Sequence, residues 1–126
     1  GSALNIKNYK LPKFDFSITS PPYMRSFDDE NPLSNYHKKG SYVQYLRDIK
    51  KVYTQIKPLM KKNATIVIEI SNTFGRGHPM TPLAWDVARE ISKIFHFERE
   101  VIYCVSHGNL ERYSSNHSYC LIFKNK

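Results

Sequence analysis

The sequence has little cysteine and no long hydrophobic run. Its two cysteines, Cys104 and Cys120, lack CxxC spacing, and its five histidines show no spacing typical of a metal site. Neither a disulfide scaffold nor a metal site is therefore expected. No apolar run approaches the ~20 residues that a membrane-spanning helix needs, and the N-terminus lacks the architecture of a signal peptide. These absences predict a soluble, cytoplasmic protein without membrane contact.

Acidic residues are scarce relative to basic ones. Lys and Arg number 19 against 11 Asp and Glu, which gives a net charge of +8 and a pI near 9.5. This excess favours a polyanionic partner such as nucleic acid. The 126 residues, 40% of them hydrophobic, fit a single domain over residues 1–126. Gly1-Ser2 resembles a cloning scar, so a natural polypeptide that is longer on the N-terminal side is compatible with this sequence.

Hydrophobic periodicity predicts an α/β fold. The predicted strands span residues 14–19, 65–70, 100–105 and 118–124. The strand at 65–70 is a nearly continuous apolar run, as expected of a parallel strand covered on both faces. The order strand, helix, strand, helix, strand, strand predicts a sheet that ends in an antiparallel hairpin.

Two amphipathic helices are predicted between the first three strands. Ser41 and Gln44 fit a capping box at the start of the first helix. Thr81 as N-cap and Pro82 at the first helical position would open the second. The polar face of the first helix and the residues just after it carry Arg47, Lys50, Lys51, Lys57, Lys61 and Lys62. Either this face is simply solvated or it contacts phosphates.

The stretch Ser20-Pro21-Pro22-Tyr23 closes the first predicted strand, at the end where open α/β sheets bind ligands. Proline fixes its own φ and holds the preceding residue extended, so this edge is rigid and presents acceptors rather than N–H donors. Ser20 and the Pro21 carbonyl could accept hydrogen bonds from the exocyclic amine of a base while Tyr23 stacks on it. The alternative is a proline-ended strand on which Tyr23 merely packs.

Several segments resemble the amino-methylating DNA methyltransferases, beginning with the motif Thr19-Ser20-Pro21-Pro22-Tyr23. The other matching segments are Lys57-Pro58-Leu59, Ile66–Ile70, Asn72-Thr73-Phe74, Thr81-Pro82-Leu83 and Asn116–Lys124. In the last segment Ser118 stands where the family usually has Glu. The resemblance implies methyl transfer from S-adenosylmethionine to the amine of a flipped base, either N4 of cytosine or N6 of adenine. The serine before the prolines favours cytosine.

By this resemblance, Ser20, Pro21, Pro22 and Tyr23 are the catalytic residues. Thr19 and Ser20 would touch only the edge of the cofactor site. Basic and polar residues in the loops would contact nucleic acid, and His117 is added by the resemblance alone. These nucleic-acid contacts are Lys38, Lys39, Arg76, Arg112, Tyr113, Asn116 and His117. Asp28-Asp29-Glu30 is either general acid–base material or a solvated acidic loop.

The family also needs a glycine-rich turn that approaches the cofactor. The candidate Phe74-Gly75-Arg76-Gly77 fits poorly, because Pro79 and Pro82 stiffen its exit and its position in the chain matches the target-base half of the family. The sequence therefore predicts the catalytic half of a Rossmann-like methyltransferase sheet without its cofactor-binding half. The motif strand would then be an unpaired edge, to be covered by another polypeptide, by a segment omitted from this sequence, or by self-association.

Two other functions remain open. One is methylation of RNA instead of DNA by the same chemistry. The other is a non-catalytic nucleic-acid-binding subunit that keeps the base pocket. A methylation assay on both nucleic acids separates the first from the main interpretation. Tyr23→Ala identifies the second, because it would weaken nucleic-acid binding while there is no methylation to abolish.

Overall fold

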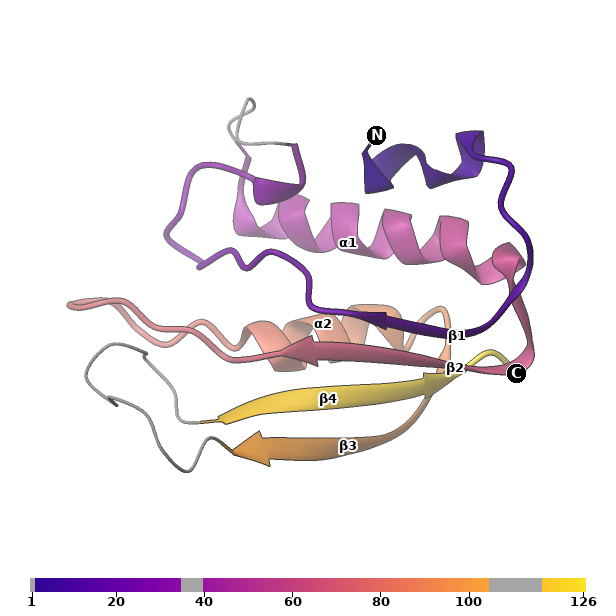
Figure 1. Ribbon diagram of the computed structural model, residues 1–126. Helices are drawn as coiled ribbons and strands as arrows, with labels where there is room; N and C mark the ends of the chain where they lie inside the picture. The colour runs from indigo at the N-terminus through magenta and orange to yellow at the C-terminus, as the bar shows by residue number, and fades with distance from the viewer. Residues whose placement is uncertain (1, 35–39, 105–116) are drawn as a thin grey trace.

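One mixed sheet forms one layer of the molecule, with the helices packed against it (Figure 1). The computed structural model describes residues 2–34, 40–104 and 117–126. Its strands are β1 (Phe14–Thr19), β2 (Met60–Ile70), β3 (His96–Cys104) and β4 (His117–Lys124). They lie in the order β1-β2-β4-β3, with β1 and β2 parallel and β4 antiparallel to both of its neighbours. The predicted α/β class, the parallel first pair and the antiparallel last pair are confirmed.

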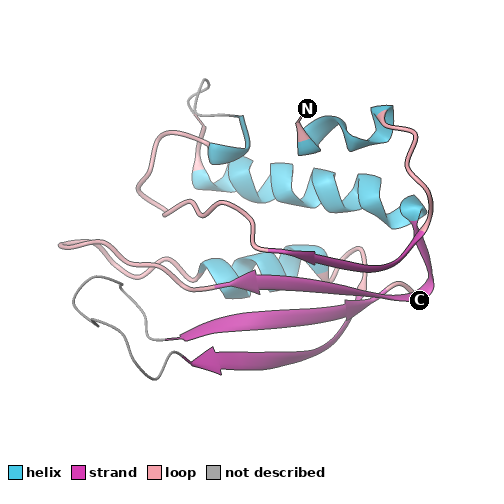
Figure 2. Cartoon of the chain, viewed as in Figure 1, coloured by secondary structure: helices cyan, strands magenta, loops and turns pink. Residues whose placement is uncertain are grey.

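Both α-helices pack on the same face of this sheet (Figure 2). These are α1 (Tyr42–Ile56) and α2 (Leu83–Ile91), accompanied by short 3-10 helices at Ala3–Asn8, Pro32–Ser34 and Lys57–Leu59. The even-numbered residues of β2 from Ile66 to Ile70 form the core with the apolar stripes of both helices. None of the helices among the described residues is long and apolar enough to cross a membrane.

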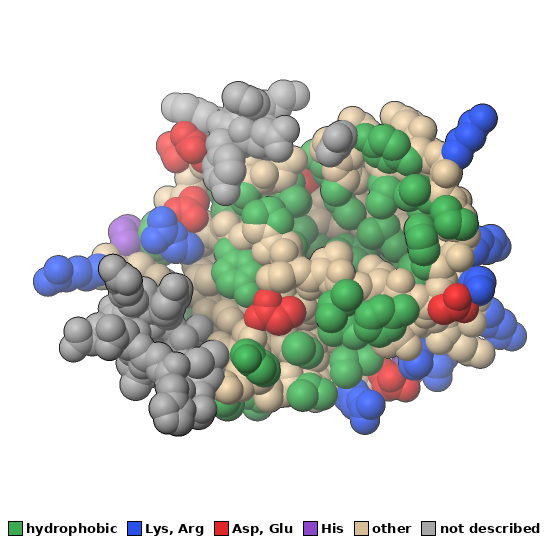
Figure 3. Space-filling model, viewed as in Figure 1, with side chains coloured by type: hydrophobic (Ala, Val, Ile, Leu, Met, Phe, Trp, Pro, Cys, Tyr) green, Lys and Arg blue, Asp and Glu red, His purple; other side chains and the backbone are tan. Residues whose placement is uncertain are grey.

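The opposite face of the sheet carries no helix among the described residues. Phe16 and Ile18 of the edge strand β1 are 53% and 64% exposed there, and Val67 of β2 is only half-buried. The prediction that residues 65–70 are covered on both faces is thus not met within the described chain. In Figure 3 hydrophobic side chains gather over the centre of the view, and Lys and Arg lie toward its margins. The sheet therefore exposes an apolar face beside an unpaired edge.

The two predicted helix starts differ in outcome. Ser41 caps α1 as predicted, because its hydroxyl accepts from the Gln44 N–H at 3.2 Å. The predicted cap at Thr81 is wrong, since α2 begins at Leu83 and Pro82 occupies the N-cap position without a side-chain hydrogen bond. Asn72 supplies the cap from outside the helix, its Oδ1 accepting from the N–H of Ala84 at 2.9 Å.

Candidate active site

The Ser20-Pro21-Pro22-Tyr23 stretch leaves β1 where the ends of two parallel strands lie together. Thr19 pairs with Ile68 of β2, which brings Ser20 next to Glu69. The Ser20 hydroxyl donates to Oε2 of Glu69 at 2.7 Å. Because its proton is committed to the carboxylate, the lone pairs of Ser20 Oγ remain able to accept a hydrogen bond from a ligand N–H. Glu69 thus orients Ser20 as an acceptor.

Tyr23 is fixed through its phenol oxygen. The backbone N–H of Ser71, just beyond β2, donates to Tyr23 Oη at 3.0 Å. Burial raises the pKa of Tyr23, and the negative charge of Glu69 raises it further, so the phenol stays neutral at physiological pH. The residue keeps 37% of its surface exposed. A partly open, held ring suits stacking against a planar group.

Two tyrosines of α1 hold the residues on either side of Ser20 and Pro21. Tyr45 is fully buried and its hydroxyl donates to the Pro22 carbonyl at 2.7 Å. Burial raises the pKa of Tyr45 well above its usual range, which keeps this hydroxyl protonated as a donor. Tyr53 Oη and Thr19 Oγ1 share a second hydrogen bond of 2.7 Å. No donor among the described residues bonds the Pro21 carbonyl, so this acceptor remains open.

Glu69, Tyr45 and Tyr53 were not predicted as site residues. Both tyrosines lie on the apolar stripe of the first helix and were interpreted as core, which is correct for their rings. The available signal was chemical, because a buried tyrosine hydroxyl usually needs a hydrogen-bond partner. Glu69 offered a similar signal as the one charged residue within the apolar run 65–70.

The loop after the motif is fastened to the loop between β2 and α2. The Phe27 ring stacks on His78 with centroids 3.9 Å apart, and the Arg25 guanidinium lies 4.7 Å from the Phe27 centroid. The Thr81 hydroxyl accepts from the backbone N–H of Ser26 at 2.8 Å and donates to the Ser26 hydroxyl at 2.9 Å. These contacts fix the chain that leaves Tyr23, and Thr81 has this task instead of capping α2.

Gly75 shows why the Phe74-Gly75-Arg76-Gly77 stretch contains glycine. A Cβ at Gly75 would lie 2.5 Å from the Phe27 ring. We expect Gly75→Ala to lower the free energy of unfolding by about 1–3 kcal/mol, because the Phe27 ring must leave its stack. Urea unfolding measures this cost. In a Phe27→Ala background most of the cost should vanish, and an equal cost in both backgrounds would contradict the packing explanation.

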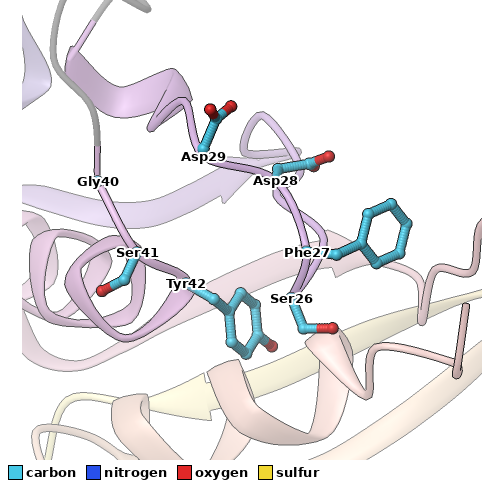
Figure 4. A pocket seen from close by; sticks show the side chains of 7 residues that line it. All are labelled: Ser26, Phe27, Asp28, Asp29, Gly40, Ser41 and Tyr42. Carbon is cyan, nitrogen blue, oxygen red and sulfur yellow. The ribbon is translucent and has the colours of Figure 1, made fainter.

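A cavity of about 510 Å³ lies between this loop and the start of α1 (Figure 4). Its lining residues are Ser26, Phe27, Asp28, Asp29, Gly40, Ser41 and Tyr42, and none belongs to the Ser20–Tyr23 stretch. Burial alone would raise the pKa of Asp28, but hydrogen bonds and charge from Arg25 outweigh it and lower the pKa. Asp28 is therefore a charged structural partner of Arg25, which argues against its use as a general acid.

The remaining predicted nucleic-acid contacts are only partly placed. Lys38, Lys39, Arg112, Tyr113 and Asn116 lie outside the described residues. Arg76 is exposed on the turn after β2.

His117 opens β4, and its carbonyl accepts from the Ser71 hydroxyl at 3.1 Å. Since Ser71 also holds Tyr23, the start of β4 lies at the same end of the sheet as the motif. Within the described ranges, no group of three His, Cys, Asp or Glu side chains is placed to hold a metal ion.

The comparisons with known proteins agree on one family and one fold. The N6/N4 family of DNA methylases matches residues 14–126. No curated protein matches the chain by sequence.

Among solved structures, a Thermus thermophilus protein described as a DNA modification methylase shares 20% identity, with a TM-score of 0.70 over 98% of this chain and 51% of its own. Its complex with S-adenosyl-L-methionine gives the same TM-score at 18% identity. PvuII DNA methyltransferase, described as cytosine-N4-specific, is 12% identical with a TM-score of 0.75, covering 100% of this chain and 48% of its own. The chain thus spans about half the length of these proteins.

Proposed function

The chain belongs to the N6/N4 DNA methylase family, and from this we propose that it is the target-base half of an enzyme that transfers a methyl group from S-adenosylmethionine to a base amine in DNA. The observation that carries the proposal is the oriented acceptor at Ser20, bound to Glu69 at 2.7 Å beside the open Pro21 carbonyl and the held ring of Tyr23. Cytosine N4 is favoured over adenine N6, because serine precedes the prolines and one similar structure is described as cytosine-N4-specific.

The described residues can act on the base without forming a covalent bond to it. Ser20 Oγ and the Pro21 carbonyl accept the two amine hydrogens, which turns the nitrogen lone pair out of the base plane and toward the methyl donor. Tyr23 stacks on the flipped base and replaces the base stacking of the duplex, at about 1–3 kcal/mol per base. The Glu69 carboxylate is linked to the base amine through Ser20 by two successive hydrogen bonds. Its negative charge favours the positive charge that develops on the amine nitrogen.

The described residues fit only the edge of a cofactor site. S-adenosylmethionine, when bound, supplies an electrophilic methyl group on a sulfonium. The Thr19 hydroxyl bonds Tyr53 of α1, which turns its side chain toward the helix-covered face, so Thr19 contributes mainly backbone atoms toward the cofactor. Ser20 is the other residue at this edge, and the proton of its hydroxyl is committed to Glu69, so it can meet the cofactor only as an acceptor. Most of the residues that hold the cofactor must come from elsewhere.

A cofactor-binding half that pairs with β1 completes the proposal. It is supplied by another polypeptide or by a segment outside this sequence. Three features support it: the chain spans about half the length of similar structures, β1 is a sheet edge, and Phe16 and Ile18 are exposed beside the motif. Self-association through β1 is the competing arrangement, and a dimer of this chain without any other polypeptide would favour it.

A non-catalytic nucleic-acid-binding subunit is the second candidate. Ser118, which is buried at the start of β4, stands where the family usually has Glu. This departure lies at the same end of the sheet as Tyr23 and favours a site that has changed its role.

The test is the nucleoside produced when the chain, assembled with its cofactor-binding half, receives duplex DNA and isotope-labelled S-adenosylmethionine. We expect N4-methylcytosine by mass spectrometry, and none with Tyr23→Ala. Detection of N6-methyladenine instead would change the target base to adenine but would still support methyl transfer to a base amine in DNA. Label in RNA alone, or DNA binding that depends on Tyr23 without any methylation by the assembled protein, would overturn it in favour of one of the alternatives.

A further inference from the structure

A second cavity lies on the side of α1 that faces away from the sheet. It has a volume of about 370 Å³ and is lined by Lys7, Arg47, Lys50, Lys51, Thr54 and Gln55. We call it the basic groove. One wall is α1 and the other is the 3-10 helix Ala3–Asn8, which lies above α1 in Figure 1. No lining residue belongs to the Ser20–Tyr23 stretch or to the cavity beside it.

The charge of the basic groove is almost uncompensated. No acidic residue lines it, and Lys7, Arg47 and Lys51 form no ion pair with any described residue. Lys50 alone has an acidic neighbour, Glu90 at 3.6 Å. Elsewhere Arg25, Lys61, Arg89 and Lys93 each lie within 4.0 Å of a carboxylate. The groove therefore gathers four cations between two walls, and only one of them lies within ion-pair distance of a described carboxylate.

The two walls are held in place by Gln55. Its side-chain oxygen accepts from the backbone N–H of Lys7 at 3.2 Å, and its side-chain nitrogen donates to the Leu4 carbonyl at 3.0 Å. Both ends of the amide thus fasten the N-terminal 3-10 helix to α1. Lys7 is thereby kept opposite the basic residues of α1, so the groove is a formed feature with two charged sides.

The spacing of the cations matches a phosphate backbone. Arg47, Lys50, Lys51 and Thr54 follow the i, i+3, i+4, i+7 pattern of one helix face, opposite the buried stripe that contains Tyr45 and Tyr53. The four residue steps from Arg47 to Lys51 rise about 6 Å along the helix. One DNA strand places a phosphate every ~3.4 Å along the duplex axis, so the α1 cations span about two phosphates.

We propose that the basic groove binds the sugar–phosphate backbone of duplex DNA, at a site separate from the base site. Charge attracts any polyanion, and the choice of duplex DNA follows from the family to which residues 14–126 belong. The contact is independent of base sequence, because the phosphates are the same at every nucleotide and carry no sequence information. It adds affinity and a fixed orientation of the duplex on the chain, whether or not a base is methylated.

The test is the salt dependence of duplex DNA binding, measured by fluorescence anisotropy with the whole chain and a labelled duplex of about 20 base pairs, which is long enough to cover the groove. The Arg47→Gln/Lys51→Gln variant should bind at least tenfold more weakly near 0.1 M salt, with the slope of log K against log salt reduced by about 2. Lys7→Gln, on the other wall, should reduce the slope by about 1. Glutamine keeps helix propensity, and circular dichroism checks the fold.

The matched control is Lys62→Gln/Lys126→Gln, which removes the same charge from exposed residues outside the groove. Equal losses in the control pair and the groove pair would overturn the proposal in favour of diffuse charge. It is also wrong if the groove variants keep wild-type affinity and slope, or if they lose binding only to duplex RNA. Tyr23→Ala should leave the slope unchanged, so this result is independent of whether the methyl-transfer proposal holds.

Discussion

The Ile18→Asp variant is expected to fold like the wild type but to lose association with the cofactor-binding half, and with it all methyl transfer. Ile18 is 64% exposed on the edge strand β1, so an aspartate there disturbs no core contact of this chain. In the assembled enzyme the same position would lie under the second half, where an unpaired carboxylate costs several kcal/mol to bury. Analytical ultracentrifugation measures the association, and incorporation of labelled methyl groups measures the activity.

Val43→Asp is the matched control for this variant. Val43 is also exposed, at 55%, but it lies in the first turn of α1, where an acidic residue is favoured by the helix dipole. We expect Val43→Asp to keep wild-type association and activity. Full association of Ile18→Asp would show that β1 is not the interface. A monomer of this chain alone that binds S-adenosylmethionine tightly would show that no second half is needed.

Local patterns predicted the elements on which the site is built. The prolines after Thr19 marked the end of β1, and Ser41 marked the start of α1, because each acts on its own neighbourhood. The cap of α2 was missed for the opposite reason. Asn72 lies twelve residues before the Ala84 N–H that it caps, and Thr81, which has the right residue type and place, is instead bound to Ser26.

The partners of the motif could not be predicted because they depend on the packing of distant segments. Ser20 meets Glu69 only through the register of the parallel pair, in which Thr19 lies opposite Ile68. A shift of one residue would turn Glu69 to the helix-covered face. Tyr45 likewise reaches Pro22 only because the first turn of α1 packs next to the chain that leaves β1. A sequence pattern identifies such residues as core or surface but not as neighbours.

The acceptor role of Ser20 leads to the second large effect, that of Glu69→Gln. The change keeps the shape of the side chain but replaces a carboxylate, which can only accept, by an amide that can also donate. When the amide N–H donates to Ser20 Oγ, the serine proton turns toward the base amine and one acceptor is lost. The carboxylate charge that favours the developing cation is lost as well. We expect kcat of the assembled enzyme to fall on the order of 10²–10³-fold with little change in KM, as for the loss of one preorganised hydrogen bond.

Two measurements separate this role from a merely structural one. If Glu69 acts through Ser20, the Glu69→Gln/Ser20→Ala double variant should be no slower than Ser20→Ala alone, whereas multiplied losses would show that Glu69 acts independently. The second readout needs only this chain. Because burial and the Glu69 charge both raise the pKa of Tyr23, Glu69→Gln should lower that pKa. An unchanged Tyr23 titration would place the carboxylate away from the ring and contradict the arrangement of Ser20, Glu69 and Tyr23 around one bound base.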